Sequence, residues 1–502
     1  MDRENSFSSL DGLRVYMVGI KGTGMAALAE LLLKRGGVVS GSDTEEKFYT
    51  DEVLESLNIP VIEGFSGDNL PEEIDLVVYS AAYSAETNPE LRAAVLRKLP
   101  LMTYPEALGF VSRLSPSLAV AGVHGKTTTA ALIGTLVKRL GLPVSVLVGS
   151  AVPSLGGGSV YVGGDDCFIA ETCEYRRHFM NFSPERIILT SVEPDHLDYF
   201  QGYEDIVSAF TDFLLTLPEG GECIYCIDDS GARDAAGRAR RRFAEEGRRI
   251  RFTPYGAGAE GPYGVTGIAA DEGMTRFRLR GIDREFRLRL PGRHTVLDCA
   301  AALAAVLPMT GDWTVAGEEG GAASPEGAAR LLDAVAAGVA DFAGSRRRSE
   351  IVGDAGGVLF MDDYGHHPTA IQSTLEGLKR FYPRRRLVVD FMSHTYSRTG
   401  ALFEEFASAF SSADLVVFHR IYGSAREREA EGVTGKNLFE AARKRGTRAV
   451  YYHEVMDAAG YLENELEPGD LFLTLGAGNN WTLGRHLYEH FRAAGPEEET
   501  AV

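Results

Sequence analysis

The residues with the clearest chemical potential form a glycine-containing loop that runs from Gly122 to Thr129 and reads Gly-Val-His-Gly-Lys-Thr-Thr-Thr. An apolar strand precedes this loop and a helical pattern follows it. Glycines let backbone N–H groups surround phosphate oxygens, and a helix N-terminus adds partial positive charge. Lys126 can then reach the β- and γ-phosphates, and the Thr127 hydroxyl can bind Mg²⁺. The general pattern has glycine at the position of Val120, so we interpret this as a variant triphosphate loop rather than a plain turn.

Two polar residues follow later strands and are candidate ligands for a hard cation, which prefers oxygen ligands in addition to phosphate. Glu171 follows the apolar strand 167–170, and His196, in Asp195-His196-Leu-Asp198, follows strand 187–190. Either residue alone is more often a cap or part of a hydrogen-bonded turn. Their shared position at the carboxyl edge of one sheet, beside the loop, favours Mg²⁺ binding together with Thr127.

A second glycine loop stands near the N-terminus and reads Gly19-Ile-Lys-Gly22-Thr23-Gly24. This is a G-x-x-G-x-G spacing, which differs from the G-x-G-x-x-G of dinucleotide-binding proteins. Asp43 follows the second strand, where a ribose-binding acid would fall. The loop therefore predicts a diphosphate at the start of the next helix, without specific support for NAD.

The last third of the chain carries two polar clusters, each after an expected strand. Residues 362–368 contain Tyr364 and the adjacent His366 and His367, and residues 394–399 contain His394 and Arg398. The planar fork of an arginine suits a carboxylate. The adjacent histidines either bind a metal or cap the following helix. The triplet of arginines at 346–348 either serves a phosphate or is a solvated charge run.

These residues need elements to position them, and strands alternate with helices throughout the chain. Strand 14–18 and helix 24–34 open the first segment, helix 127–140 follows the triphosphate loop, and strands 358–361 and 387–391 belong to the third segment. An arginine-rich stretch, 233–251, reads as a solvated helix. Such alternation predicts parallel sheets covered on both faces. We expect three α/β domains: a Rossmann-like domain at 1–111, a P-loop ATPase-type domain at 112–341 and a Rossmann-like domain at 342–502.

Composition narrows the class of protein. At roughly 150 residues per domain, 502 residues correspond to about three domains. The net charge of −20 argues against partners such as nucleic acid or anionic lipid. The sequence lacks both an apolar run of about 20 residues and a signal-peptide pattern, so we expect a cytoplasmic protein with no membrane contact. Cys223 and Cys226 have a C-x-x-C spacing without a second pair, which favours buried free thiols over a metal or redox site.

Taken in order, these pieces resemble the Mur ligase family over nearly the whole chain. The resemblance rests on strings at 19–25, 80 and 88–90, 122–129, 171–179, 195–196, 342–348, 362–368, 394–399 and 422–427. It implies an ATP-dependent ligase that activates a carboxylate as an acyl phosphate and couples it to an amine. The implied substrates are UDP-N-acetylmuramate and L-alanine, with ATP and Mg²⁺, in peptidoglycan precursor synthesis. A monomer and a homodimer are both compatible with it.

The resemblance also implies roles for individual residues. The catalytic residues are Lys126, His196 and Arg348, and Mg²⁺ is bound by Thr127, Glu171 and His196. ATP is bound by Gly122, His124, Gly125, Lys126, Thr127, Thr128 and His294. The UDP-sugar is bound by Gly19, Gly22, Thr23, Gly24, Met25, Asp43 and Ser80, and the amino acid by Tyr364, His366, His394 and Arg398.

The chain departs from the family pattern at several positions. The family's His-Asn-x-x-Asn is His294-Thr295-Val-Leu-Asp298 here, and other family residues are replaced by Ser191, Met392, Ser393 and Asn479. Three other functions therefore remain as alternatives: a recycling ligase that attaches a whole peptide to the same sugar nucleotide, a nucleotide-binding homologue without catalysis, and a nicotinamide dehydrogenase. The wrong glycine spacing in the first loop argues against the dehydrogenase.

Overall fold

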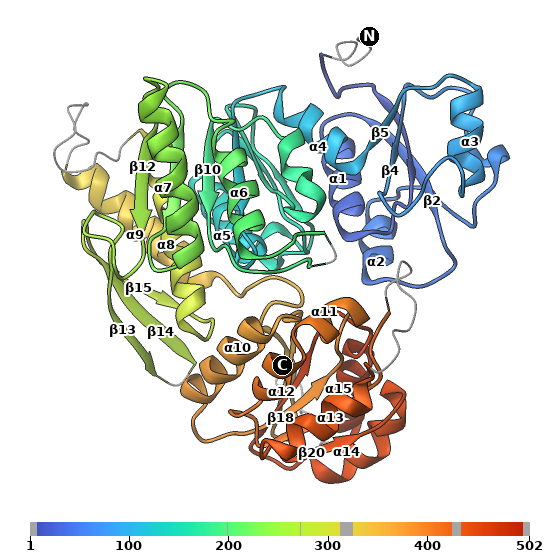
Figure 1. Ribbon diagram of the computed structural model, residues 1–502, viewed down its shortest axis with the longest axis vertical. Coiled ribbons are helices and arrows are strands. Elements are labelled where there is room, and N and C mark those ends of the chain that lie inside the picture. The colour runs from blue at the N-terminus through green and yellow to red at the C-terminus, as the bar shows by residue number, and fades with distance from the viewer. Residues whose placement is uncertain (1–7, 198, 272, 312–324, 424–432, 495–502) are drawn as a thin grey trace, which may run out of the picture.

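The computed structural model describes residues 8–197, 199–271, 273–311, 325–423 and 433–494. Three α/β domains follow one another along the chain, and the third, in orange and red, lies below the other two in the view of Figure 1. The three-domain α/β class expected from the sequence is confirmed, whereas the domain boundaries remain predictions. Asp198 and Arg426 lie outside the described residues.

The first domain is built on a parallel sheet in the order β3-β2-β1-β4-β5. Because β1 lies between β2 and β4, the loops after β1 and β4 meet at one carboxyl edge, the usual ligand position in such sheets. The strands are β1 (Arg14–Val18), β2 (Val38–Asp43), β3 (Val61–Glu63), β4 (Leu76–Tyr79) and β5 (Leu101–Thr103). The helices are α1 (Thr23–Lys34), α2 (Tyr49–Ser56), α3 (Pro89–Leu96) and α4 (Tyr104–Ser112).

The central sheet has the order β12-β11-β10-β6-β9-β7-β8 and is parallel except for β8. Its strands are β6 (Ser117–Ala121), β7 (Val144–Leu147), β8 (Val160–Val162), β9 (Cys167–Glu171), β10 (Arg186–Leu189), β11 (Glu222–Cys226) and β12 (Arg251–Tyr255). Its helices are α5 (Lys126–Leu140), α6 (Tyr203–Leu214), α7 (Ser230–Glu245), α8 (Arg293–Val306) and α9 (Pro325–Asp341). The expected helix at 233–251 is therefore too long, because it ends at Glu245 and Arg251 starts β12.

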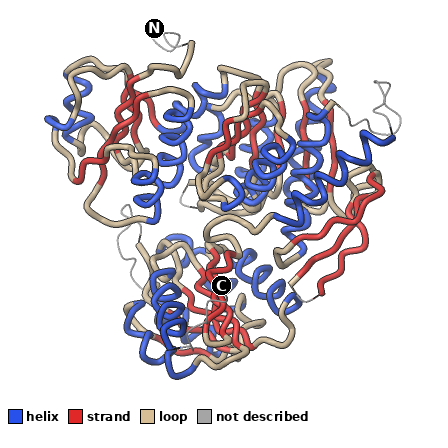
Figure 2. Tube along the Cα trace, turned by 180° about the vertical axis from the view of Figure 1, so that it is seen from behind, coloured by secondary structure: helices blue, strands red, loops and turns tan. Residues whose placement is uncertain are grey.

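An antiparallel sheet of β13 (Val265–Asp271), β14 (Met274–Leu279) and β15 (Ile282–Leu288) is appended to the central domain. The sequence interpretation missed it. Its middle strand alternates between buried and exposed residues, with Phe277 and Leu279 buried and the basic Arg276 and Arg278 exposed. Period-two alternation of this kind marks a strand with one solvated face, so the signal was present. Figure 2 shows this sheet on the outside of the molecule, at the lower right.

The third domain has the sheet order β16-β17-β21-β18-β19-β20, parallel except for β16. The strands are β16 (Glu350–Ala355), β17 (Val358–Asp363), β18 (Arg386–Phe391), β19 (Leu415–Phe418), β20 (Ala449–Tyr451) and β21 (Asp470–Leu475). The helices are α10 (Pro368–Phe381), α11 (Tyr396–Ala401), α12 (Phe403–Ser408), α13 (Gly435–Lys444), α14 (Ala459–Glu465) and α15 (Trp481–Ala494). Among the described residues, no helix is both long and apolar enough to cross a bilayer.

The start of α3 shows how local sequence sets an element, and it supports a stability prediction. Asn88 is buried and its side-chain oxygen accepts hydrogen bonds from the N–H groups of Glu90 and Leu91 at 2.9 and 3.1 Å, with Pro89 at the first helical position. We expect Asn88→Ala to lower the free energy of unfolding of the first domain by about 1 kcal/mol, because two N–H groups lose their acceptor. Thermal unfolding measures this. Asn88→Ser keeps an acceptor and should recover most of the loss, and equal destabilisation by both variants would contradict the capping role.

Candidate active site

The triphosphate loop lies at the middle of the central sheet's carboxyl edge. β6 leads into it, and the neighbouring strands β9 and β10 place Glu171 on one side of it and residues 190–196 on the other. Gly122 and Gly125 have φ of +139° and +80°. A Cβ atom at Gly122 would lie 2.0 Å from Thr190 Oγ1, and one at Gly125 would lie 2.3 Å from Asp298 Oδ1. Only glycine therefore fits at these two positions.

Lys126 opens α5 and its ammonium group lies in the mouth of the loop. It donates to the Gly122 carbonyl at 2.5 Å and to Glu174 Oε2 at 2.8 Å. Glu174 is buried. Burial lowers the pKa of Lys126, but the Glu174 carboxylate more than offsets this and the pKa is raised overall. The lysine is thus charged and paired with a carboxylate in the position where a phosphate would compete for it.

Glu174 was not assigned a role from the sequence. The only indication in the sequence was that Glu174 follows Glu171 by three residues, in the stretch 171–179. A short 3₁₀ segment, Tyr175–Asn181, follows it, and Arg176 and Arg177 have positive φ of 51° and 57° there. Non-glycine residues with positive φ are strained, and such strained residues are common at functional sites, where the surrounding structure holds them in place.

Glu171 ends β9 beside the loop and is well placed to bind a cation. Its Oε2 atom is buried and has no hydrogen-bond partner among the described residues. Burial raises the pKa of its carboxyl group, although a hydrogen bond from Thr127 and the charge of Lys126 oppose this. Gly149 leaves room for the group, since a Cβ there would lie 1.5 Å from Glu171 Oε1. An unpaired buried carboxylate oxygen next to a threonine hydroxyl suits a hard cation.

His196 lies beside two other carboxylates, those of Glu174 and Asp195. Its Nε2 atom is 3.7 Å from Glu174 Oε1 and 3.9 Å from Asp195 Oδ2, and its φ is +51°. These three side chains offer ligand atoms within 4.8 Å of one another, and Glu171 is not part of that group. The geometry therefore adds Glu174 and Asp195 to the set that can surround a cation at this edge.

The third domain reaches this edge through Arg398 in α11. Its Nε atom donates to Asp195 Oδ1 at 2.9 Å, and both side chains are more than nine-tenths buried. Burial raises the pKa of Asp195, but Arg398 more than offsets this and the pKa falls well below its usual range. A buried ion pair therefore joins the central and third domains at the site, and Arg398 is charged and oriented.

The three other residues predicted to bind the amino acid gather next to Arg398. The His366 ring lies 5.2 Å from the Tyr364 ring and 6.3 Å from the His394 ring, and His366 Nδ1 is 3.0 Å from the Tyr364 carbonyl. Burial, followed by the charge of Arg398, lowers the pKa of His366 well below its usual value. A neutral imidazole beside a cation is thus available to a small zwitterion.

The arginine triplet is not a solvated charge run, because its members make different contacts within the molecule. Arg346 pairs with Glu52 of α2 in the first domain, at 3.2 Å. Arg347 is buried in the third domain, where its Nε donates to Asp362 at 3.0 Å. The Arg348 guanidinium lies 5.1 Å from the centroid of the Tyr364 ring and acts electrostatically on Glu171. Residues 346–348 therefore form a junction where the three domains meet, with Arg348 directed to the site.

In the first domain, the glycine loop after β1 meets the end of β4. Gly19 has φ of +81°, and a Cβ there would lie 3.0 Å from Ser80 Cβ and 2.7 Å from Tyr83 Cε2. The Lys21 N–H donates to Asp43 Oδ2 at 2.7 Å, and burial raises the pKa of Asp43. Asp43 thus holds the loop in shape. The remaining predicted residues, Gly22, Thr23, Gly24 and Met25, lie at the start of α1.

His294 and the replaced asparagines lie at the start of α8. The His294 ring packs against Gly292, where a Cβ would lie 2.5 Å from His294 Cε1, and burial lowers the pKa of His294. Thr295 Oγ1 is used locally, donating to the Pro291 and Gly292 carbonyls at 3.0 and 2.8 Å. Asp298 instead faces Gly125 of the triphosphate loop, and burial raises its pKa well above the usual value.

Comparison with known proteins identifies the family. Sequence models of the catalytic, middle and glutamate ligase domains of the Mur ligase family match residues 14–115, 120–306 and 347–478. A UDP-N-acetylmuramate–L-alanine ligase of Treponema pallidum (strain Nichols) is 49% identical over 98% of this chain and 99% of its own. One of Desulfitobacterium hafniense is 39% identical over 95% and 99%.

This chain belongs to the Mur ligase family.

Solved structures agree with this assignment at the level of fold. The crystal structure of a UDP-N-acetylmuramate–alanine ligase from Thermotoga maritima has a TM-score of 0.76 at 23% identity, covering 96% of this chain and all of that one. A murein peptide ligase from Psychrobacter arcticus has a TM-score of 0.65 at 21% identity, covering 96% and 99%. Cys223 and Cys226 are buried free thiols on β11, and burial is the main cause that raises both pKa values.

Proposed function

We propose that this Mur ligase joins L-alanine to the carboxylate of UDP-N-acetylmuramate at the expense of ATP, through an acyl phosphate, in peptidoglycan precursor synthesis. The 49% identity to a UDP-N-acetylmuramate–L-alanine ligase over 98% of the chain carries the proposal. The positions of Lys126, Glu171 and Arg398 around the carboxyl edge of the central sheet support it. ATP and UDP-sugars are cytoplasmic metabolites, so we place the reaction in the cytoplasm.

In this proposal each predicted domain binds one substrate. Residues 1–111 bind the UDP-sugar, residues 112–341 bind ATP, and residues 342–502 bind the amino acid. The muramate carboxylate attacks the γ-phosphorus, and Lys126 offsets charge on the phosphate oxygens, since such transfer depends on alignment and charge neutralisation. The alanine amine then attacks the acyl carbon, and Arg348 stabilises the tetrahedral oxyanion that forms. This intermediate breaks its C–O bond to release inorganic phosphate, and the nitrogen loses a proton to leave the amide. Closure of the third domain over the site excludes water, which would otherwise hydrolyse the acyl phosphate.

Mg²⁺ fits the residues present. Thr127, Glu171 and His196 were predicted to hold it, and the unpartnered buried Oε2 of Glu171 beside Thr127 supports this set. Glu174 and Asp195 lie within ligand distance of His196. When bound, the ion would supply positive charge to the phosphate oxygens and to the leaving ADP.

The decisive experiment measures ADP and phosphate release with purified protein and Mg²⁺. We expect release only when UDP-N-acetylmuramate and L-alanine are both present. Replacing L-alanine by L-Ala-γ-D-Glu-meso-diaminopimelate tests the recycling ligase, and activity with the tripeptide alone would favour that alternative. No release under either condition would identify a nucleotide-binding homologue without catalysis.

The Mg²⁺ site makes a separate prediction. We expect Glu171→Gln to raise the Mg²⁺ concentration for half-maximal activity by at least about 10-fold, because even loss of a residue that only supports a metal ligand weakens binding by ~10–100-fold. Activity at a series of Mg²⁺ concentrations measures this. Glu185→Gln is the control, because Glu185 is exposed and precedes β10 at the opposite end of the same sheet. An unchanged Mg²⁺ dependence in Glu171→Gln would remove this residue from the metal site.

A further inference from the structure

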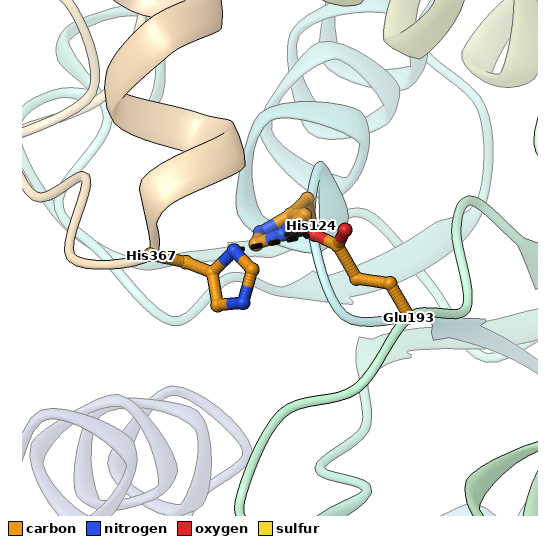
Figure 3. A group of neighbouring side chains, drawn as sticks. All are labelled: His124, Glu193 and His367. Atoms are coloured by element: carbon orange, nitrogen blue, oxygen red, sulfur yellow. Dashed lines mark hydrogen bonds and ion pairs between the residues drawn. The ribbon is translucent and has the colours of Figure 1, made fainter. Parts of the chain in front are cut away.

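A second group of potential metal ligands lies between the triphosphate loop and the third domain. His124 of the loop, Glu193 after β10 and His367 at the start of α10 offer ligand atoms within 4.8 Å of one another. Figure 3 shows the three side chains converging, with His367 approaching from the α10 side and His124 and Glu193 from the central domain. The ligand sets predicted for Mg²⁺ and alanine do not include Glu193 or His367.

The polar groups of this cluster lie close together, but not all of them have hydrogen-bond partners among the described residues. His124 Nε2 contacts Glu193 Oε1 directly, and His367 Nδ1 lies 3.5 Å from the same oxygen. The second carboxylate oxygen accepts from Thr369 Oγ1 at 3.1 Å, which orients the group. His367 is 95% buried, and its Nε2 atom has no hydrogen-bond partner among the described residues. Two imidazole rings thus lie against one carboxylate oxygen. The buried His367 ring also has a nitrogen, Nε2, without a hydrogen bond among the described residues.

We propose that His124, Glu193 and His367 bind a divalent ion of the zinc class, which ties the triphosphate loop to the third domain. Two imidazole nitrogens and one carboxylate oxygen are a ligand set that Zn²⁺ uses with a fourth position left for water. Hard Mg²⁺ prefers oxygen ligands and would not favour this set.

The geometry requires only small movements. With metal–ligand bonds of about 2.0–2.1 Å, neighbouring ligand atoms in a tetrahedral site lie roughly 3.3 Å apart. The 3.5 Å between His367 Nδ1 and Glu193 Oε1 is close to that value. His124 Nε2 and Glu193 Oε1 have to move slightly apart, as an ion between them would require. The ion would replace two contacts: the direct one between His124 and Glu193, and the long hydrogen bond from the Thr369 N–H to His367 Nδ1, at 3.4 Å.

The other candidate clusters are less suited to this ion. Glu174, Asp195 and His196 form the second group of three within 4.8 Å among the described residues, but they hold only one imidazole and already pair with Lys126 and Arg398. His486 and His490 lie one turn apart on α15 near Glu463, at 3.2 and 3.7 Å, and their side chains are 44% and 45% exposed. That exposed group is the natural internal control.

The test measures Zn²⁺ binding to the full chain without nucleotide, by competition with a chromophoric chelator. His367→Asn is the chosen variant, because His367 is the N-cap of α10 and asparagine is a favoured N-cap that lacks the imidazole. Glu193→Gln removes the charge and keeps the shape. We expect the wild-type chain to bind one Zn²⁺ that each variant binds at least about 100-fold more weakly, because loss of a direct ligand costs no less than loss of its supporting residue.

Two further measurements distinguish a domain-bridging site from surface binding. Zn²⁺ should raise the thermal unfolding midpoint of the wild-type chain and leave that of His367→Asn unchanged. Co²⁺ should give the strong visible absorption of a four-coordinate site in the wild-type chain only. The proposal is overturned if His367→Asn binds Zn²⁺ as tightly as the wild type, or if binding is lost in His486→Gln instead. Both variants leave Lys126 and Glu171 in place, so failure here does not bear on the ligase activity.

Discussion

Replacing Lys126 by alanine should lower the rate of ATP-dependent ligation by about 1000-fold or more. The ammonium group lies at the mouth of the triphosphate loop, between the Gly122 carbonyl and Glu174. Cations that stabilise a transferring phosphoryl group contribute factors of this order, because the interaction strengthens as charge moves during transfer. Phosphate release that depends on both UDP-N-acetylmuramate and L-alanine measures the loss. Near-normal turnover would refute the assignment of the loop.

Stability must be separated from catalysis in this variant. Glu174 is 3% exposed and loses its cation in Lys126→Ala, and an unpaired buried carboxylate is destabilising. Lys126→Ala/Glu174→Gln removes both charges, so it should unfold close to the wild-type temperature while remaining inactive. Lys138→Ala is the matched control, because Lys138 lies on the same helix α5 and is exposed. This control should be as active as the wild type.

Replacing Arg398 by methionine should raise the KM for L-alanine by about 100-fold, with a smaller effect on the KM values for ATP and the sugar nucleotide. Arg398 is charged, buried and positioned beside His366, and hydrogen bonds to charged groups contribute about 1.5–3 kcal/mol each. Initial rates at varied alanine concentration measure the change. Arg385→Met is the control, because Arg385 lies in the same domain directly before β18, at the opposite end of the sheet, and pairs with Asp354.

A different result would assign Arg398 to domain closure. If its main role were to hold Asp195 and so dock the third domain, all three KM values would rise and kcat would fall together. Arg398→Met/Asp195→Asn distinguishes the two roles. Removing both charges relieves the unpaired carboxylate, so this double variant should restore stability but not alanine binding. Recovery of the alanine KM in the double variant would contradict the carboxylate-binding role.

The two predictions rest on one shared structural feature. Lys126 and Arg398 are both paired with buried carboxylates, Glu174 and Asp195. Each pair keeps a cation desolvated, charged and oriented before its substrate arrives. In the proposed reaction, a phosphate or an amino-acid carboxylate would exchange for the protein carboxylate, so that binding replaces one ion pair by another. This exchange costs less than desolvating a free lysine or arginine at the moment of binding.

Much of the site could be predicted from the sequence because its motifs are local. The strand–glycine loop–helix order around Lys126 predicts backbone N–H groups and a lysine at one point, and this needs only the chain from 118 to 140. The helix expected at 127–140 is observed at Lys126–Leu140. Strand 14–18 was predicted at its observed bounds and strand 387–391 to within one residue, because continuous apolar runs bounded by turns identify buried parallel strands.

No local sequence pattern indicates which distant segments pair with each other. Glu174 with Lys126, Arg398 with Asp195, and His367 with Glu193 join segments that are 48, 203 and 174 positions apart in the numbering. The arginine triplet is the clearest case, because three consecutive side chains of one type have different partners: Glu52 of the first domain, Asp362 and the Tyr364 ring. Spacing in the sequence cannot distinguish them.

The sequence by itself thus determined the class of fold, the phosphate chemistry and the residue types that carry it, because these depend on patterns within about one strand and one helix. The tertiary structure alone decided which carboxylate faces which cation, and which of two adjacent histidines caps a helix and which lies beside an arginine. The order of strands in each sheet sets those neighbours, and that order arises from packing between segments far apart in the chain.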